Sequence, residues 1–361
     1  MALGFGIIGC GMISSFHARA INDVRGAKLI GGLDSVPGAA EKLAANFGCK
    51  AYTRLKDMLS DPEIDVVTIA TPSGAHMEPA VAAARAGKHV IVEKPLEITL
   101  RRCDKIIREC QKAGVVLSTI FPSRFHDASR QLKRAIDQGR FGQLTLGDAV
   151  VKWYRTQAYY DSGAWRGTWQ LDGGGALMNQ SIHSVDLLAW LMGPVVEVTA
   201  QMALIAHERI DVEDVAVATV YFLNGALGII EASTAVYPGY LKRIEIHGSA
   251  GSAVLEEEDL VKWDFIKKTK ADDAILSKMA ERKSDAGGAA DPAAIGHHGH
   301  ARQFQDVVNA IRKGTKPLID GPEGRRAVEI ILAIYKSAET GRAVRLPLAS
   351  DPPLKARNTT R

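Results

Sequence analysis

Cysteine is scarce in this sequence, and its four residues (Cys10, Cys49, Cys103 and Cys110) show none of the paired spacings typical of metal sites or disulfide frameworks. We therefore expect free thiols, a reducing cytoplasmic location and no bound metal. No apolar run reaches the length of a membrane-spanning helix, and the apolar N-terminus has no basic segment before it, so neither a membrane anchor nor a signal peptide is expected. A basic stripe with interleaved aromatic residues is also missing, which argues against nucleic-acid binding.

What is present fits a protein built from more than one globular domain. The chain has 361 residues, of which 46% are hydrophobic and 24% charged, enough to bury two cores. The net charge of +4 includes Lys355, Arg357 and Arg361, which lie in a C-terminal tail (residues 346–361) that we expect to be disordered. A mild positive balance suits anionic cofactors but identifies none.

Short apolar runs alternate with helical patterns over the first 120 residues. The runs are nearly continuous rather than alternating, as in strands buried on both faces of a parallel sheet. The predicted strands are Leu3–Ile8, Lys28–Leu33, Val66–Ala70, His89–Val92 and Val115–Ile120, and the predicted helices between them include Ala39–Phe47, His76–Ala86 and Leu100–Ala113. Several helices end at glycine, the usual residue just beyond a helix C-terminus. This order predicts a doubly wound α/β domain over residues 1–122.

Residues 123–345 are predicted to form a second, α+β domain. A helix (Ala128–Gln138) precedes a run of strands, and the alternation around Val217, Thr219 and Tyr221 is typical of a mostly antiparallel sheet with one exposed face. The strands are Gln143–Tyr154, Val195–Leu204, Val215–Phe222, Leu227–Val236, Leu241–His247 and Gly251–Glu256, followed by helices His300–Arg312 and Glu323–Thr340. Asp320 and Glu323 form a capping pair before the last helix. We expect a helix and a mobile loop in residues 267–299.

A glycine-rich turn follows the first strand. Gly9-Cys10-Gly11-Met12-Ile13-Ser14 is close to the pattern G-x-G-x-x-G/A, in which glycines let the backbone approach a pyrophosphate at a helix N-terminus. Asp34 ends the second strand 20 residues after Ser14, where an acid suits the ribose hydroxyls of NAD and disfavours the 2′-phosphate of NADP. The alternative is a plain turn with a helix-capping aspartate. The glycine motif, its position after the first strand and the acidic Asp34 together favour a dinucleotide site.

Two further turns follow strands whose C-terminal ends should line the same crevice. One is Thr71-Pro72-Ser73, which is equally compatible with a simple turn. The other is Glu93-Lys94-Pro95, where the proline favours extended backbone at Lys94. A lysine in such a place can lose and regain a proton when partly desolvated, whereas the alternative is a surface ion pair at a strand end.

A nearly all-apolar helix is predicted over Ala176–Met192, after three glycines (Gly173–Gly175) and before Gly193 and Pro194. Such a helix should be buried, yet Asn179 and His183 share one face at i and i+4. Buried polar groups need partners, so these residues either satisfy each other in the core or line a site. A single buried histidine is more often structural, but the glycines favour a close approach of backbone or ligand.

Taken in order, GCGMIS, Asp34, TPS, GKHVIVEKP and GGGALMNQSIHSVDLL resemble the glucose–fructose oxidoreductase / inositol dehydrogenase / rhizopine catabolism (Gfo/Idh/MocA) family of sugar dehydrogenases over residues 1 to about 345. The resemblance implies that Lys94 and His183 are catalytic, and that the Lys94–Pro95 bond is cis. Family members usually carry aspartate where this chain has Asn179, so that residue is given a binding role only. Trp165 and Arg166 match a Trp–Arg pair of the family.

The predicted site follows from these motifs. Substrate contacts are assigned to Lys94, Asn179, His183, Arg124 and Trp165, and cofactor contacts to Gly9, Gly11, Met12, Ile13, Asp34, Ser35, Thr71, Ser73, His76, Glu93, Lys94 and Arg166. Substrate specificity is expected in loops near Arg124, Tyr159–Trp165 and Tyr237–Tyr240.

The predicted reaction is hydride transfer between NAD and a carbinol of a sugar, anhydrosugar or cyclic polyol, with His183 and Lys94 handling the hydroxyl proton. One alternative is a UDP-N-acetylhexosamine type 3-dehydrogenase, for which Arg124, Arg155 and His297–His300 are candidate diphosphate contacts. Another is a non-catalytic NAD(P)-sensing regulator, although a sensor needs neither Lys94 nor His183. The resemblance also implies a homodimer or homotetramer formed through the second domain's sheet.

Overall fold

The computed structural model of the chain describes residues 1–280 and 296–353, which form two compact units. The first contains residues 1–122, 170–173 and 296–328, and the second contains residues 123–169, 174–295 and 329–361, within the described ranges. None of the described helices combines the length and the apolar character needed to cross a membrane. The predicted loop after residue 280 and residues 354–361 of the predicted disordered tail lie outside the described residues. In the described part of the tail, Leu348 is buried and its N–H donates to Glu329 Oε1, so that part is ordered, contrary to the prediction.

The first unit contains a six-stranded parallel sheet in the order β3-β2-β1-β4-β5-β6. Its strands are β1 (Leu3–Ile8), β2 (Ala27–Leu33), β3 (Lys50–Tyr52), β4 (Val66–Ile69), β5 (His89–Val92) and β6 (Leu117–Thr119). This is the doubly wound nucleotide-binding order, so the predicted fold class is confirmed. The short strand β3 was not predicted because it lies at the sheet edge, where Lys50 and Ala51 are exposed and give no apolar run.

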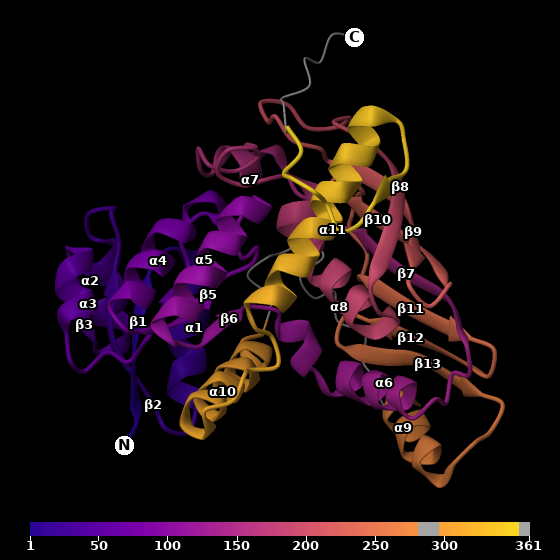
Figure 1. Cartoon of the computed structure of the whole chain (residues 1–361), viewed down its shortest axis with the longest axis horizontal. Helices are drawn as coiled ribbons and strands as arrows, with labels where there is room; N and C mark the ends of the chain where they lie inside the picture. Colours follow the sequence, from indigo (N-terminus) through magenta and orange to yellow (C-terminus); the bar gives the residue numbers. More distant parts are fainter. Residues whose placement is uncertain (281–295, 354–361) are drawn as a thin grey trace. The chain divides into compact units, whose positions relative to one another are not determined.

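The helices of this unit are α1 (Met12–Asp23), α2 (Ala39–Phe47), α3 (Leu55–Ser60), η1 (Ser73–Ala75), α4 (Met77–Arg85), α5 (Leu100–Ala113) and α10 (His298–Lys313). Helix α4 packs on α5, and α1 packs on α10 (Figure 1). The left-handed glycines at 48 and 114 end α2 and α5 as predicted.

Helix α10 belongs to the first unit, although the sequence prediction placed it in the second domain. Phe304, Val307 and Val308 are fully buried in one core cluster with Phe5 and Ile21. The apolar face of α10 therefore completes the Rossmann core. The chain returns to the first unit at residues 296–328, which the predicted domain boundary at residue 123 does not include.

The second unit contains an eight-stranded sheet in the order β13-β12-β11-β7-β10-β9-β8-β14. Its strands are β7 (Leu144–Lys152), β8 (Val195–Ala203), β9 (Val215–Phe222), β10 (Leu227–Ser233), β11 (Arg243–Gly248), β12 (Gly251–Glu256), β13 (Asp259–Phe265) and β14 (Val344–Arg345). Strands β7 and β10 pair in parallel and the other neighbours pair antiparallel. The mixed, mostly antiparallel sheet agrees with the predicted α+β class.

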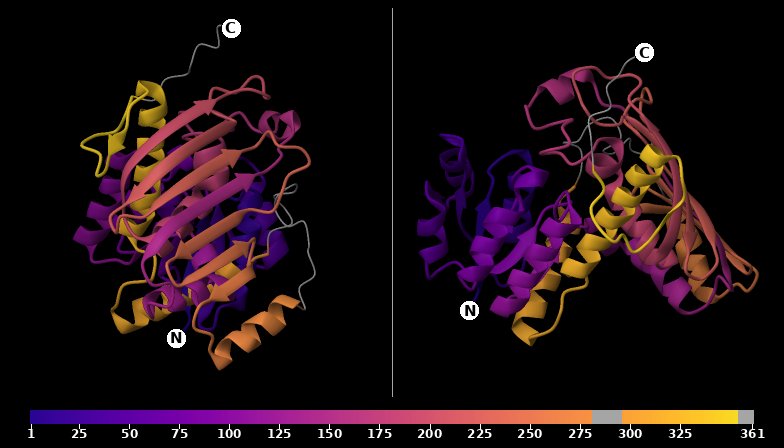
Figure 2. Two further views of the ribbon diagram at one scale, coloured as in Figure 1. Left: turned by 90° about the vertical axis from the view of Figure 1, so that its right-hand side faces the viewer. Right: turned by 45° about the horizontal axis from the view of Figure 1, so that its top comes forward.

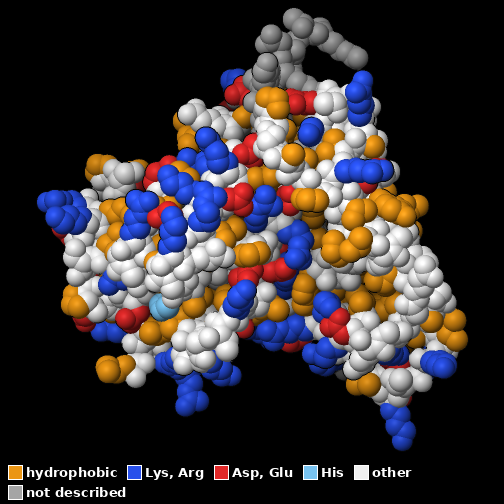
Figure 3. All heavy atoms as spheres, viewed as in Figure 1, with side chains coloured by type: hydrophobic (Ala, Val, Ile, Leu, Met, Phe, Trp, Pro, Cys, Tyr) orange, Lys and Arg blue, Asp and Glu red, His pale blue; other side chains and the backbone are white. Residues whose placement is uncertain are grey.

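One face of this sheet is covered and the other is not. Ala218 and Val220 of β9 are buried, whereas Val217, Thr219 and Tyr221, which alternate with them, are exposed. The outward side chains Leu146, Val217, Tyr221 and Leu227 remain 40–56% exposed. The strands face the viewer in the left view of Figure 2, and Figure 3 shows hydrophobic side chains at the right-hand edge, where Figure 1 places β8, β9 and β10.

The remaining helices are η2 (Pro122–Phe125), α6 (Asp127–Asp137), α7 (Gln157–Asp161), η3 (Ala176–Ser181), α8 (Ile182–Met192), α9 (Lys270–Ala280) and α11 (Gly321–Thr340). The predicted helix at 176–192 is present, but its first turn and a half, η3, is a π-helix. Before α11, the Glu323 N–H donates to Asp320 Oδ1 at 3.1 Å, which confirms the predicted cap.

Candidate active site

The glycine-rich turn joins β1 to α1 in the way that its sequence predicts. Gly9 has φ of +94°, and a Cβ there would lie 2.6 Å from the backbone of Ala70, so only glycine fits. A Cβ at Gly11, in contrast, would meet nothing within 4 Å. The first turn of α1 has neither an acidic residue nor a side-chain cap, so its N–H groups are left for an anion.

Asp34 is placed at the end of β2, where it organises this turn. Its Oδ2 accepts the N–H of Cys10 at 2.6 Å, and its Oδ1 accepts the N–H of Val36 at 2.8 Å. The carboxylate thus orients the phosphate turn directly, a role that the sequence did not reveal. Together with the open space beside Gly11, it fits a dinucleotide whose pyrophosphate lies at the start of α1.

The turns after β4 and β5 are linked by His76. This histidine is 1% exposed, and its ring nitrogens lie 2.9 Å from the carbonyl oxygen of Pro95 and 3.0 Å from that of Thr71. Thr71 in turn donates its hydroxyl to the carbonyl of Ala75. The side chain of His76 joins the two turns, and its contact with a cofactor stays a prediction, as do those of Ser35, Thr71 and Ser73.

Glu93 ends β5 as a buried carboxylate between two histidines. His17 Nε2 donates to Glu93 Oε1 at 2.8 Å, His17 Nδ1 lies 2.9 Å from Thr68 Oγ1, and His300 Nε2 is 3.6 Å from Glu93 Oε1. Burial opposes the charge of Glu93, but the two imidazoles outweigh it and hold the pKa of Glu93 well below its ordinary value. Burial also lowers the pKa of His17, so a neutral His17 donates to an ionised Glu93.

Lys94 follows directly, and its own N–H donates to Glu93 Oε2 at 2.9 Å. The Lys94–Pro95 bond is cis, as the resemblance implied. Lys94 is half-buried between fully buried neighbours, so it is the residue of this turn that reaches solvent. The turn therefore presents one ammonium group at the C-terminal end of β5.

On η3 and α8 of the second unit, Asn179 and His183 are the two residues between Ala176 and Ala189 that are not buried. Their i, i+4 spacing predicts a shared polar face on the helix. Their partial exposure agrees with residues that line a site and not with a histidine packed in the core. A π-helix immediately before His183 is also typical of functional positions.

A polar network runs from Asn179 to two arginines. Gln180 Nε2 donates to Asn179 Oδ1 at 2.8 Å and lies 2.9 Å from the Tyr159 hydroxyl. Arg155, which is 3% exposed, donates to Gln180 Oε1 at 3.0 Å. Arg166 donates to the Tyr159 hydroxyl at 2.6 Å. We call these five residues the Asn179 network.

Aromatic rings support both guanidinium groups. The Arg166 Cζ lies 4.3 Å from the ring centre of Tyr159 and 4.6 Å from that of Trp165, and Arg155 stacks on Trp153 at 4.9 Å. Among the described residues, no carboxylate lies within ion-pair distance of Arg166. Its charge is therefore available to an anion.

Arg124 lies in a different environment from the one that the sequence suggested. Its Nε and Nη2 donate to the two carboxylate oxygens of Asp186 at 2.8 and 2.6 Å, and both side chains are 1% exposed. A predicted substrate contact is thus engaged in a buried bidentate pair with helix α8. A contact of Arg124 with substrate stays a prediction, and its burial weighs against it.

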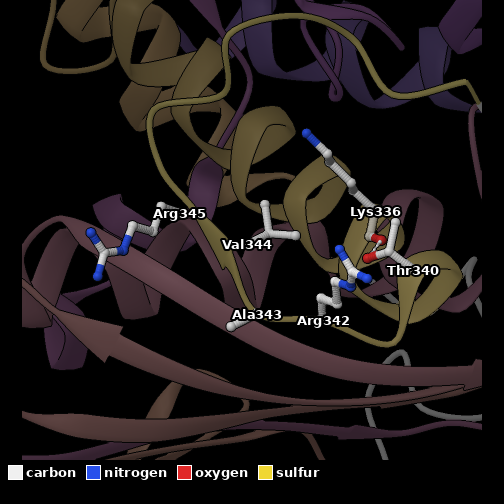
Figure 4. Close-up of a pocket in the computed structure, with 6 residues that line it drawn as sticks. All are labelled: Lys336, Thr340, Arg342, Ala343, Val344 and Arg345. Atoms are coloured by element: carbon white, nitrogen blue, oxygen red, sulfur yellow. Dashed lines mark hydrogen bonds between the residues drawn. The ribbon is translucent and has the colours of Figure 1, made fainter.

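A cavity of about 550 Å³ lies at the C-terminal end of α11 beside β14 (Figure 4). Figure 4 shows Val344 between Arg345 on one side and Lys336 and Arg342 on the other. None of the predicted site residues lines this cavity. It is therefore not the site that the motifs describe.

The sequence analysis missed several residues of these clusters. His17 could have been suspected, because a histidine on the apolar face of a helix needs partners. Gln180 lies between two residues that were singled out, yet a lone amide carries no signal. Glu213 and Tyr335, which contact the residues around the start of η3, are too far from it in sequence to be paired by any local pattern.

Comparison with known proteins agrees with this arrangement. Residues 3–121 match the family described as "Oxidoreductase family, NAD-binding Rossmann fold", and residues 129–254 match the GFO/IDH/MocA C-terminal domain. The myo-inositol 2-dehydrogenase of Thermotoga maritima is 29% identical over 94% of this chain and 98% of its own.

Two solved structures are also similar. The WlbA dehydrogenase from Bordetella pertussis, in complex with NADH and UDP-GlcNAcA, is 36% identical with a TM-score of 0.87, covering 96% of this chain and 98% of its own. Levoglucosan dehydrogenase, in complex with NADH and levoglucosan, is 25% identical with a TM-score of 0.83, covering 96% and 100%. The phosphate turn and the Glu-Lys-Pro turn lie within the first matched range and the helix of His183 lies within the second, and the chain belongs to the Gfo/Idh/MocA family as an NAD-dependent dehydrogenase.

Proposed function

We propose that this dehydrogenase oxidises a hydroxyl-bearing carbon of a UDP-linked sugar, of the type represented by UDP-GlcNAcA. The observation that carries the proposal is the Asn179 network, which connects the polar face of the His183 helix to two guanidinium groups. A substrate with a diphosphate, a carboxylate or both would use the guanidinium group of Arg166, whereas a neutral polyol would not. Arg155 is 3% exposed and holds Gln180 in place from the buried side. The similarity to the WlbA dehydrogenase over nearly the whole of both chains supports the same class.

The chemistry that we assign to the chain concerns the hydroxyl proton and the charge that develops on oxygen. His183 takes the proton from the substrate hydroxyl, because its imidazole is the side chain best suited to do so near neutral pH. The ammonium group of Lys94 stabilises the developing alkoxide. NAD, when bound, accepts the hydride from the same carbon.

Other residues bind and orient. Asn179 cannot accept a proton, so its amide positions the substrate. Gly9, Gly11, Met12 and Ile13 would hold the pyrophosphate at the start of α1, and Asp34 would face the adenosine ribose while it orders the turn. Arg166 and Trp165 are assigned to the anionic part of the substrate rather than to the cofactor.

A second candidate is the oxidation of a free cyclic polyol or anhydrosugar. It is supported by the myo-inositol 2-dehydrogenase of Thermotoga maritima and by levoglucosan dehydrogenase, which also resemble nearly the full chain. A non-catalytic NAD-sensing regulator is less well supported, since it would need neither Lys94 nor the half-buried His183.

The test is NADH formation from NAD⁺ by the wild-type chain with UDP-GlcNAcA, UDP-GlcNAc, myo-inositol, scyllo-inositol, levoglucosan and glucose. Arg166→Met, which keeps the length of the side chain, should raise the KM of a UDP-sugar by roughly 10-fold or more and leave the KM of NAD⁺ unchanged. Turnover of inositol alone, insensitive to Arg166→Met, would replace the UDP-sugar proposal with the polyol one.

We further propose that the exposed sheet face forms a homodimer or homotetramer interface. Leu227 of β10 is opposite Leu146 of β7 and Tyr221 of β9, so these exposed apolar side chains form one patch. Leu227→Asp should lower the mass of the assembly in light scattering. An unchanged mass for this variant would remove the face from the interface.

A further inference from the structure

Glu213 lies in the loop before β9, and its carboxylate and backbone point at the start of the helix that carries His183. Glu213 Oε2 accepts the N–H of Gly175 at 2.9 Å and Oε1 accepts the N–H of Leu177 at 2.8 Å. Between them, the N–H of Ala176 donates to the backbone carbonyl of Glu213 at 3.0 Å. One residue therefore accepts three successive N–H groups that the helix itself cannot satisfy.

Tyr335 of α11 completes the arrangement from the other side. Its hydroxyl donates to Glu213 Oε1 at 2.9 Å, and both residues are buried, Tyr335 fully and Glu213 to 3% exposure. The edge of Trp169 packs on the Tyr335 ring at 5.1 Å between centres. The tyrosine is thus fixed by packing and holds one carboxylate oxygen in place.

The triple glycine is explained by the same contacts. A Cβ at Gly175 would lie 1.8 Å from the backbone oxygen of Glu213, and a Cβ at Gly174 would lie 2.0 Å from the Tyr335 hydroxyl. Larger residues would push the turn away from its acceptors. The close approach that the glycines predicted is made by Glu213 and Tyr335.

Burial of the Glu213 carboxylate disfavours its charged form, and the hydrogen bonds around it offset only part of that free-energy cost. Burial raises the pKa of Glu213 to about 7, even though the N–H groups of Leu177 and Gly175 and the Tyr335 hydroxyl favour the charged form. A neutral cap of ordinary helices, such as serine, would avoid the burial of charge altogether.

We propose that Glu213 and Tyr335 are positioning residues that fix the start of η3, and through its backbone the place of Asn179 and His183. The path is short: the N–H of Asn179 donates to the carbonyl of Gly175 at 3.0 Å, and Gly175 is held by Glu213. The π-helical turn leads from there to His183 without an intervening loop. This inference rests on the proposed role of His183 and extends it to residues that do not touch the substrate.

The test uses the full chain with Glu213→Gln, which keeps the shape but replaces one acceptor oxygen by a donor. Amide hydrogen exchange of the peptide spanning residues 173–187 should become roughly tenfold faster or more, because one of the two N–H groups bound by the carboxylate loses its acceptor. The kcat should fall roughly 10- to 100-fold, while the KM of NAD⁺ and the circular dichroism stay unchanged. Glu208→Gln, in the same loop but with an 82% exposed side chain, is the matched control.

Tyr335→Phe provides a second variant that removes one hydroxyl and keeps the packed ring. It should lower kcat roughly 2- to 5-fold with a smaller increase in exchange. Unchanged exchange in both variants would overturn the capping role, and faster exchange with wild-type kcat would overturn its link to catalysis. A failure of the proposed function can be distinguished from a failure of this inference. It would appear as wild-type activity that does not depend on His183. The hydrogen-exchange measurement, in contrast, needs no turnover.

Discussion

Asp186→Asn should destabilise the second unit strongly, because it removes the carboxylate of the buried pair with Arg124. Both side chains are 1% exposed and are joined by two hydrogen bonds of 2.8 and 2.6 Å. Breaking a buried pair by removing one partner costs about 3–5 kcal/mol, since it leaves the other charge in a poorly solvating interior. Asp186 also lies one turn beyond His183, so the loss would reach the helix that carries the candidate base.

The double variant Arg124→Met with Asp186→Leu separates the charge from the packing. Replacing both ions by apolar groups of similar size is often neutral or stabilising, so we expect the double variant within about 2 kcal/mol of wild type. The exposed pair of Lys133 and Asp137 on α6 is the control, and Asp137→Asn should cost less than about 1 kcal/mol.

Tryptophan fluorescence in urea measures this directly. All five tryptophans (Trp153, Trp165, Trp169, Trp190 and Trp263) belong to the second unit, so their transition reports on that unit alone. A cost of Asp186→Asn below about 1 kcal/mol, or a double variant as unstable as the single one, would show that the buried charge of Arg124 does not depend on Asp186 for its stability. A stable double variant with a greatly raised substrate KM would restore Arg124 as a substrate contact.

The remaining predictions concern the proposed chemistry. Lys94→Ala should retain NAD binding by isothermal titration but lose roughly 10²- to 10⁴-fold in kcat, and near-wild-type turnover would remove Lys94 from the mechanism. His183→Ala should lose a similar factor and alter the pH profile of kcat/KM, whereas an unaltered profile would point to a structural histidine. Asp34→Ala should weaken the binding of NAD more than that of NADP in binding titrations. It should also loosen the turn at Cys10, because the Asp34 carboxylate accepts the N–H of Cys10. If the preference for NAD over NADP does not change, Asp34 does not contact the ribose.

The elements that the sequence predicts well are those whose pattern is local. The continuous apolar runs of β1 and β5 and the glycine-terminated helices α2 and α5 appear with the predicted ends. The spacing of Asn179 and His183 likewise anticipates the two half-buried positions of an otherwise buried helix. Each of these signals lies within a dozen residues, so no knowledge of the tertiary structure is needed.

What the sequence does not reveal depends on contacts between distant segments. Glu213 is 38 residues from Gly175 and 122 from Tyr335, and His17 is 76 residues from Glu93. The same limit explains α10, whose amphipathic pattern predicts a helix but not the core in which it packs. The π-helical geometry of η3 was also unpredictable, because its turn is held by a loop nearly 40 residues away.

The most direct test of the account is NADH formation from UDP-GlcNAcA and NAD⁺ by the wild-type chain, Lys94→Ala and His183→Ala in parallel. We expect turnover by the wild type that both substitutions reduce by orders of magnitude while NAD binding persists. Turnover that survives either substitution would contradict the assigned chemistry. If the wild type forms no NADH with UDP-GlcNAcA but turns over a neutral polyol, the assigned substrate class is wrong.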